Sequence, residues 1–228
     1  GQLDAVVRRA RRVHVAGPAG AGKTMLVASW TGGADTTVFW HAFAPRLGGA
    51  LPGLLLELGE HLLPGDPSLA SYLRAALPRA DLGLAARIAL ASLRREPRLL
   101  VLDDFDAVAR DASVEVFLDA VARLPSATIV TVGRGRGRPG IPCVSVPALS
   151  ANEVAALLAL RGAGDDPGTA RHLHCWTGGN VRLVDAAAAC LTGSPEAGRE
   201  TLLHAAGDHA ALVRTAARLM WSARGRAA

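Results

Sequence analysis

The sequence has little of several features that mark particular classes of protein. No apolar run approaches the roughly 18 residues of a membrane-spanning helix, so we predict no membrane span. The three cysteines, Cys143, Cys175 and Cys190, are odd in number and widely spaced, which fits neither a disulfide framework nor a paired-cysteine zinc site. We expect reduced thiols in the core of a cytoplasmic protein. The chain starts at Gly1 without a basic and then apolar stretch, so we expect no signal peptide and an excised segment of a longer protein.

Positive charge comes almost entirely from arginine, because 24 of the 25 basic residues are Arg and one is Lys. The net charge is +5 and the isoelectric point is near 10.0. A basic domain can bind nucleic acid, but these arginines are scattered and cluster only at residues 8–12 and 133–138. We therefore do not expect this segment to bind nucleic acid directly. Half of the residues are hydrophobic, which excludes a disordered chain and allows a sizeable core.

The hydrophobic pattern changes after residue 148. Residues 1–148 alternate apolar runs typical of strands with segments typical of helices, which predicts an α/β domain with a mainly parallel five-stranded sheet. The predicted strands are Arg12–Ala16, Thr36–Trp40, Arg98–Asp103, Ala127–Val132 and Ile141–Val146. The predicted helices between them are Leu3–Ala10, Met25–Trp30, Leu51–Leu63, Ser68–Leu77, Leu82–Arg95 and Ser113–Leu124.

Residues 149–228 are predicted to be helical throughout, as a lid or subdomain. Ser150 and Glu153 have the spacing of a capping box at its start, and Ser113 is the expected cap of the last helix in the first domain. The predicted helices of the subdomain are Asn152–Arg161, Pro167–Trp176, Asn180–Leu191, Pro195–Ala206 and Asp208–Ser222.

One segment carries a complete nucleotide-binding motif. Residues 17–24, GPAGAGKT, match GxxxxGK[ST] and lie between a predicted strand and a predicted helix, the context that this motif requires. Glycines let backbone N–H groups converge on phosphate oxygens, and the helix N-terminus adds a favourable dipole. The only lysine of the chain, Lys23, stands where a compact charge suits the β- and γ-phosphates better than a planar guanidinium. The predicted nucleotide contacts are Gly17, Pro18, Ala19, Gly20, Ala21, Gly22, Lys23, Thr24 and Met25.

An acidic pair follows the apolar strand Arg98–Asp103. We expect Asp103 and the Thr24 hydroxyl to hold Mg²⁺, and Asp104 to orient or polarise the attacking water. The alternative is a strand that ends in a solvated Asp-Asp turn. Asp106 is expected to cap the next turn.

Arg134 ends the strand after that. If this strand lies between the loop strand and the acid strand, Arg134 comes near the γ-phosphate, where it senses the nucleotide or stabilises transferred charge. The alternative is a flexible Gly/Arg loop over residues 133–140, in which Arg136 and Arg138 face solvent or a partner. The predicted catalytic residues are Asp104, Lys23 and Arg134.

Together these motifs resemble the STAND class of P-loop NTPases. The sequence looks most like the nucleotide-binding domains of MalT-like, LuxR-type and SARP-type bacterial transcriptional regulators. The resemblance covers about residues 1–192 and depends on six stretches. They are GPAGAGKTMLVASW (17–30), VFW (38–40), LLVLDD (99–104), TVGR (131–134), VPALSANE (146–153) and TGGN (177–180).

The resemblance implies an ASCE-type P-loop fold that binds ATP or ADP with Mg²⁺. It implies that the TGGN turn caps the nucleotide through Asn180 and Val181, the latter standing where the family usually has Pro. It also implies a switch in which ADP holds a closed form, ATP permits opening and self-association, and slow hydrolysis resets the cycle. Sensor and DNA-binding domains would lie outside this chain, and residues 195–228 would complete the subdomain or begin a winged helix.

Two other functions fit the same motifs: an AAA+-like motor or loader acting on DNA, and a scaffold that binds nucleotide without hydrolysing it. ATP rather than GTP follows from the resemblance, and no NKxD-type guanine motif occurs. His172, His174 and Cys175 look like a metal cluster. Helical spacing puts His174 off the face that the other two share, so we expect a packing role for these residues.

Overall fold

The computed structural model describes residues 2–44, 50–62, 71, 75 and 81–193. These residues divide into two units. The first comprises Gly1–Gly17 and Lys23–Ser145, and the second comprises Pro18–Gly22 and the chain from Val146 onward. Most of the phosphate-loop motif therefore groups with the C-terminal unit rather than with the domain predicted for residues 1–148.

A five-stranded parallel sheet forms the centre of the first unit. Its strands are β1 (Arg12–Ala16), β2 (Thr37–Ala42), β3 (Arg98–Asp103), β4 (Ala127–Gly133) and β5 (Cys143–Ser145). Their order across the sheet is β2-β3-β4-β1-β5. The predicted α/β class, the parallel sheet and the position of β4 between the loop strand and the acid strand are confirmed.

The carboxyl ends of these strands share one edge of the sheet, because all the pairs are parallel. Ala16 at the end of β1 pairs with Gly133 at the end of β4. Asp103 at the end of β3 pairs with Ala42 at the end of β2. Every residue of β3 is buried, as its continuous apolar run predicts for a strand covered on both faces.

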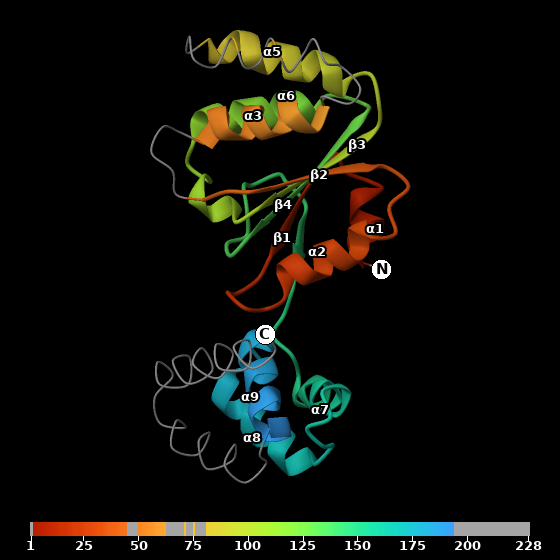
Figure 1. Ribbon diagram of the computed structural model, residues 1–228, viewed down its shortest axis with the longest axis vertical. Helices are drawn as coiled ribbons and strands as arrows, with labels where there is room; N and C mark the ends of the chain where they lie inside the picture. The colour runs from red at the N-terminus through yellow and green to blue at the C-terminus, as the bar shows by residue number, and fades with distance from the viewer. Residues whose placement is uncertain (1, 45–49, 63–70, 72–74, 76–80, 194–228) are drawn as a thin grey trace. The chain divides into compact units, whose positions relative to one another are not determined.

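Helices cover both faces of this sheet (Figure 1). Helices α3 (Ala50–Leu62), α5 (Leu82–Leu93) and α6 (Ala112–Ala122) lie together on one face, and α1 (Gln2–Val7) and α2 (Lys23–Thr31) lie on the other. Apolar side chains of α3, α5 and α6 pack on β2, β3 and β4 in one cluster that includes Leu54, Leu58, Leu93, Leu100 and Leu118. The helix predicted over Ser68–Leu77 lies outside the described residues except for two positions.

The cap of α6 differs from the prediction. Asp111, not Ser113, precedes the helix, and its carboxylate accepts hydrogen bonds from the N–H groups of Ser113 and Val114. The Ser113 hydroxyl also donates to Asp111, which lowers the pKa of that carboxyl. Asp111 is the more favourable cap, because its carboxylate accepts two N–H hydrogen bonds and also complements the positive end of the helix.

The second unit contains α7 (Ala151–Leu160), α8 (Pro167–Thr177) and α9 (Val181–Gly193). Their apolar sides share a small core that includes Val154, Leu158, Leu173 and Val184. The predicted capping box is confirmed, since Ser150 and Glu153 exchange hydrogen bonds across the first turn of α7. The helices predicted over Pro195–Ala206 and Asp208–Ser222 lie outside the described residues.

The cysteines are less buried than predicted. Cys143 and Cys175 are exposed and Cys190 is partly buried, and all three are free thiols. Cys143 is one of two exposed residues on the short strand β5, in which exposed and buried positions alternate. Among the described helices none is long and apolar enough to cross a membrane. His172 stacks on Trp176 at 6.0 Å between ring centroids, in agreement with the packing role expected for it.

Candidate functional site

The central residues of the phosphate loop alternate in backbone conformation. Gly20 and Gly22 have φ of 77° and 87°, whereas Ala21 between them is not in the positive-φ region. An alternation of this kind turns successive N–H groups toward the same side, which makes a concavity suited to an anion. A Cβ placed on Gly22 meets nothing nearer than 3.8 Å, so the glycine serves the conformation there rather than a close contact.

Asn180 lies against this loop within the second unit. Its side-chain N–H donates to the carbonyl of Ala19 at 2.7 Å, and the Arg182 N–H donates to the carbonyl of Gly20 at 3.2 Å. The Asn180 side-chain oxygen accepts from the N–H groups of Arg182 and Leu183, so the same side chain caps α9. A Cβ on Gly20 would overlap the Asn180 amide. The predicted contact residue Asn180 thus holds the loop backbone itself. Val181, the other predicted contact, lies near the loop, since a Cβ on Gly22 would lie 3.8 Å from its side chain.

The turn before Asn180 is equally close-packed. Gly178 and Gly179 have φ of 60° and 70°, and the Gly179 carbonyl accepts from the Leu149 N–H at 2.8 Å. A Cβ on Gly179 would overlap the Leu149 carbonyl. The TGGN segment needs its two glycines for these reasons, and it ties the start of α9 to the segment that leads into α7.

In the first unit, the remaining motif residues lie at the end of β1 and the start of α2. Gly17 is buried and directly follows β1. Lys23 and Thr24 form the first turn of α2, where N–H groups without helical partners favour an anion. Met25 follows them and is 73% exposed.

The acidic pair has two different environments. Asp103 is buried, and its Oδ1 accepts a hydrogen bond from the Asp104 N–H at 2.9 Å. Asp104 is exposed, and its φ of 50° is positive, which no other non-glycine residue shows in the described part of the chain. Asp tolerates this conformation better than most residues. The chain turns here from β3 into the short 3₁₀ helix η2 (Phe105–Ala107).

Arg134 directly follows β4, and its side chain is exposed. Because β4 lies between β1 and β3, Arg134 leaves the sheet edge between Gly17 and Asp103. Asp106 was predicted to cap the next turn, and this prediction was wrong. Its carboxylate accepts the N–H groups of Arg134 at 2.6 Å and Gly135 at 3.3 Å. Sequence spacing contains no signal for this contact, because the partners are 28 residues apart and are backbone groups.

His14 is a second contact that the sequence did not indicate. It is buried in β1, with Nδ1 2.9 Å from the Thr131 hydroxyl and Nε2 2.9 Å from the carbonyl of Gly135. Burial lowers the pKa of His14 below its ordinary value, although the Gly135 bond and the nearby Asp106 act in the opposite direction. The neutral ring donates from Nε2 to Gly135 and accepts at Nδ1 from Thr131.

Arg138 is paired within the chain rather than left to solvent or a partner. Its guanidinium donates to Asp119 at 2.8 Å and to Glu115 at 3.2 Å, both on α6. The same two carboxylates bind the buried guanidinium of Arg12. The hydrogen bond from Arg138 lowers the pKa of Asp119. The alternation of Gly and Arg after β4 therefore belongs to a held segment, and Arg136 remains exposed.

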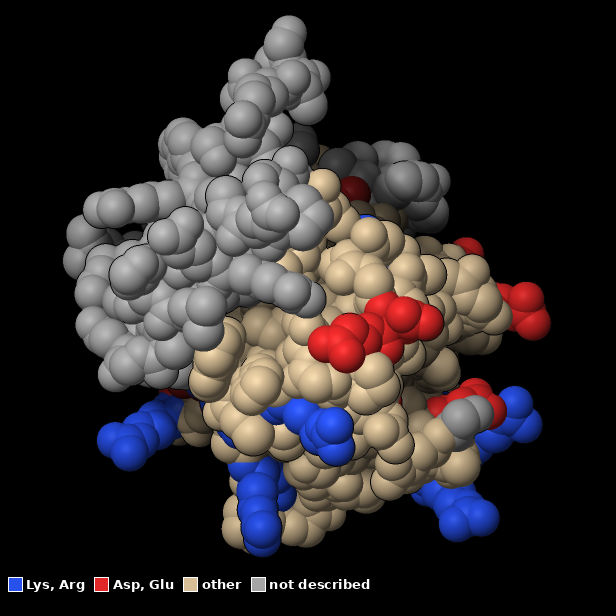
Figure 2. All heavy atoms as spheres, turned by 90° about the horizontal axis from the view of Figure 1, so that it is seen from below, with Lys and Arg blue, Asp and Glu red and all other residues tan. Residues whose placement is uncertain are grey.

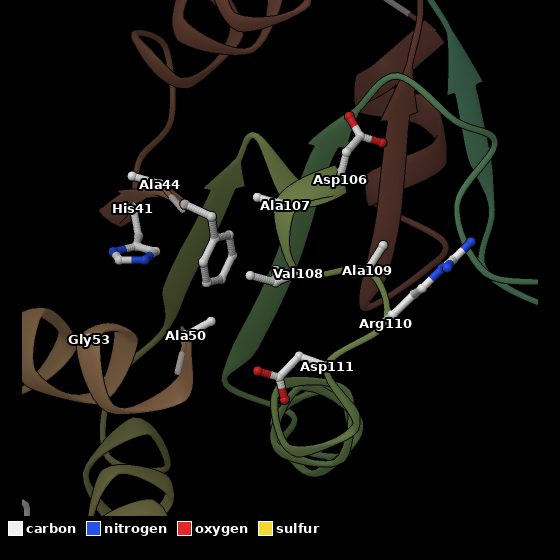
Figure 3. A pocket seen from close by; sticks show the side chains of 11 residues that line it. His41, Ala44, Ala50, Gly53, Asp106, Ala107, Val108, Ala109, Arg110 and Asp111 are labelled. Carbon is white, nitrogen blue, oxygen red and sulfur yellow. The ribbon is translucent and has the colours of Figure 1, made fainter. Parts of the chain in front are cut away.

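Two cavities lie beside these strand ends in the first unit. One has about 390 Å³ and is lined by the end of β2, the start of α3 and residues 106–111 (Figure 3). The other has about 650 Å³ and lies between η2, α6 and residues 135–139. Figure 3 shows the Asp106 carboxylate pointing away from His41 and Asp111. None of the predicted site residues of this unit lines either cavity, whereas Asp106 lines both.

The residue types predicted for the site suit Mg²⁺ and a polyphosphate by their chemistry. Mg²⁺ prefers oxygen ligands, and Thr24 and Asp103 supply a hydroxyl and a carboxylate. The loop N–H groups and the Lys23 ammonium suit phosphate oxygens. Within the described residues, no group of three or more His, Cys, Asp or Glu side chains forms a metal-binding cluster of another kind.

Comparison with solved structures identifies the fold. A STAND ATPase with a tetratricopeptide-repeat sensor from Pyrococcus horikoshii matches 82% of this chain with a TM-score of 0.62 and 18% identity. A Walker-type ATPase of Pyrococcus abyssi matches 98% with a TM-score of 0.61 and 13% identity. This chain has the P-loop NTPase fold. The Drosophila origin recognition complex bound to DNA shares it, over 94% of this chain, with a TM-score of 0.56 and 16% identity.

In each of these neighbours the matched region is part of a longer chain. The chain spans 29% of the STAND protein, 70% of the Walker-type ATPase and 62% of the matched origin-complex chain. No protein-family model and no curated protein sequence matched the chain.

Proposed function

We propose that this chain is an ATP- and ADP-binding regulatory NTPase module of a cytoplasmic bacterial transcriptional regulator. The observation that carries the proposal is the GPAGAGKT loop between β1 and α2, in a chain whose strand β3 ends in Asp103 and whose strand β4 is directly followed by Arg134. The likeness to a STAND ATPase supports the nucleotide-binding fold of this module, and the switch that self-associates with ATP follows from the sequence resemblance alone. Sensor and DNA-binding domains belong to the parts of the protein outside this chain.

Each predicted site residue has one role in this proposal. The loop N–H groups and Lys23 bind the phosphates, and Asp104 orients the attacking water. Arg134 responds to the γ-phosphate. Thr24 and Asp103 hold Mg²⁺, which neutralises charge on the β- and γ-phosphate oxygens. Asn180 keeps the loop in its binding conformation through Ala19.

The first test is to denature the purified protein and identify released nucleotide by chromatography. Stoichiometric ADP supports a closed resting switch. An empty protein is then titrated with ATP and Mg²⁺, and absence of binding at millimolar concentration refutes the proposal. Light scattering with ATP and with ADP measures self-association, and the proposal requires the larger particle with ATP.

Lys23→Ala tests the assignment of the phosphate loop. Removal of a charge-assisted phosphate contact is expected to lower ATP affinity on the order of 100-fold. The protein should keep its circular dichroism spectrum, because the Lys23 side chain is not part of the core. Arg94→Ala, at the exposed end of α5, removes the same charge elsewhere and should change affinity less than twofold. Equal effects of the two variants would refute the assignment.

A DNA-associated AAA+-like ATPase is the second candidate, favoured by the likeness to the DNA-bound origin recognition complex and by the basic composition. The distribution of charge is less favourable to this candidate. On the face shown in Figure 2, the Lys and Arg side chains of the described residues stand apart from one another rather than in one basic patch. This candidate predicts DNA-stimulated hydrolysis and binding that weakens steeply with salt. Turnover unchanged by DNA at low salt would exclude it.

A nucleotide-binding scaffold without hydrolysis is the remaining alternative. Asp104→Asn distinguishes it from the two enzymes. The amide that replaces the carboxylate is uncharged and has one acceptor oxygen in place of two, so it accepts the proton of the attacking water poorly. We expect turnover in this variant to fall at least tenfold with nucleotide affinity retained. Turnover equal to the parent protein means that Asp104 has no catalytic role.

A further inference from the structure

The segment from Gly133, the last residue of β4, to Gly137 would be mobile on composition alone. Three of the five residues from Gly133 to Gly137 are glycine, and glycine loses more conformational freedom on ordering than any other residue. Arg134 is the second residue of this segment. An arginine on a freely moving backbone pays for ordering each time it engages a ligand.

The structure instead holds this backbone at three polar groups of two consecutive residues, Arg134 and Gly135. The Asp106 carboxylate accepts the N–H of Arg134 through Oδ2 and the N–H of Gly135 through Oδ1, at 2.6 and 3.3 Å. The His14 ring donates from Nε2 to the carbonyl of Gly135 at 2.9 Å. Hydrogen bonds to a carboxylate are stronger than neutral ones, so Asp106 supplies the larger part of the restraint.

The packing around these bonds is close. A Cβ on Gly133 would lie 3.0 Å from the His14 ring and 3.1 Å from Asp106. Gly137 has φ of 73°, and a Cβ there would lie 2.8 Å from the same ring. The glycines that make the segment flexible in isolation are therefore the residues that let Asp106 and His14 approach its backbone.

We propose that Asp106 is a positioning residue that fixes the backbone of Arg134 and so determines how strongly the protein distinguishes ATP from ADP. His14 restrains the same segment through its hydrogen bond to the carbonyl of Gly135. This inference rests on the proposed function, in which Arg134 responds to the γ-phosphate. In this proposal Asp106 acts through the segment that both of its oxygens hold, and not through a contact with the nucleotide. Loss of Asp106 leaves ADP binding intact and weakens only the contribution that Arg134 makes with ATP.

The test uses Asp106→Asn in the full chain. An amide has one acceptor oxygen, so one of the two N–H groups loses its partner while the side chain keeps its size. The matched control is Asp111→Asn, because Asp111 is a partly exposed Asp that also accepts two backbone N–H groups, those of Ser113 and Val114, but holds no part of the Arg134 segment. Asp106→Glu replaces Asp106→Asn if the latter does not fold.

Amide hydrogen exchange measured by NMR without nucleotide tests the restraint itself. We expect the amide of Arg134 or Gly135 to exchange at least tenfold faster in Asp106→Asn, and neither to change in Asp111→Asn. Unchanged exchange of both amides in Asp106→Asn overturns the proposal, whatever the protein binds.

Affinities for ADP and for a slowly hydrolysed ATP analogue test the consequence. Asp106→Asn should lower the preference for the ATP analogue about tenfold, equivalent to 1.4 kcal/mol, with ADP affinity unchanged within twofold. In an Arg134→Ala background the same substitution should have no further effect on that preference. A fall in both affinities alike, or an effect that multiplies with that of Arg134→Ala, overturns the proposal. If the parent protein binds neither nucleotide, the proposed function fails and this inference fails with it.

Discussion

The contact between the phosphate loop and Asn180 predicts a large difference between two glycine substitutions. Gly20→Ala and Gly22→Ala each place a methyl group on a residue with positive φ, 77° and 87°. Left-handed backbone costs a non-glycine residue about 1–2 kcal/mol. At Gly22 this is the whole cost, because the nearest atom to the new Cβ is 3.8 Å away.

At Gly20 the new methyl group also displaces the Asn180 amide, which lies within overlap distance. That displacement breaks the 2.7 Å hydrogen bond to the Ala19 carbonyl, worth about 0.5–1.5 kcal/mol. Gly20→Ala should therefore lower the free energy of unfolding by roughly 1.5–3.5 kcal/mol, and by about 1 kcal/mol more than Gly22→Ala.

Urea unfolding of the nucleotide-free variants, followed by circular dichroism, measures both values. The decisive variant is Gly20→Ala combined with Asn180→Ala. Removing the amide leaves room for the methyl group, so Gly20→Ala in this background should cost no more than Gly22→Ala does in the parent. Equal costs for the two glycine variants, or no relief from Asn180→Ala, would show that the loop is not held in this way.

Two further predictions concern the first unit. His14 has a lowered pKa, so the unfolded chain binds more protons than the folded one between that pKa and the ordinary value of 6.5. Stability should therefore fall as pH drops below 6.5, by at most about 1.4 kcal/mol per pH unit from this group, and His14→Gln should flatten the profile measured by urea unfolding. Leu118→Ala removes a fully buried side chain from α6 and should cost about 2.7–5 kcal/mol, whereas Val116→Ala on the same helix, 69% exposed, should stay within about 0.5 kcal/mol. If stability depends on pH equally in the parent protein and in His14→Gln, the first prediction is wrong. Similar losses of stability in Leu118→Ala and Val116→Ala would contradict the second.

Local patterns predicted the framework well where they depended on periodicity. The bounds of β1 and β3 agree with the strands predicted over Arg12–Ala16 and Arg98–Asp103. For β3 the reason is its continuous apolar stretch, which a strand buried on both faces needs. The capping box at Ser150 was equally predictable, since both of its hydrogen bonds join residues three apart. The cap of α6 was missed, because Asp111 and Ser113 both suit a cap and only the exact start of the helix decides between them.

The sequence by itself determined which segments form the five strands, although not the bounds of β2 and β5, together with the order of motifs along the chain and the residue types of a phosphate loop with its acidic partner. These depend on neighbours a few residues apart. Only the tertiary structure showed that Asn180 holds the carbonyl of Ala19, 161 residues away, and that Asp106 holds the backbone of Arg134. In both contacts one partner is a backbone group, which every residue carries. No residue type marks such a partner in advance, so the pairing emerges only when strand order and packing bring the two segments together.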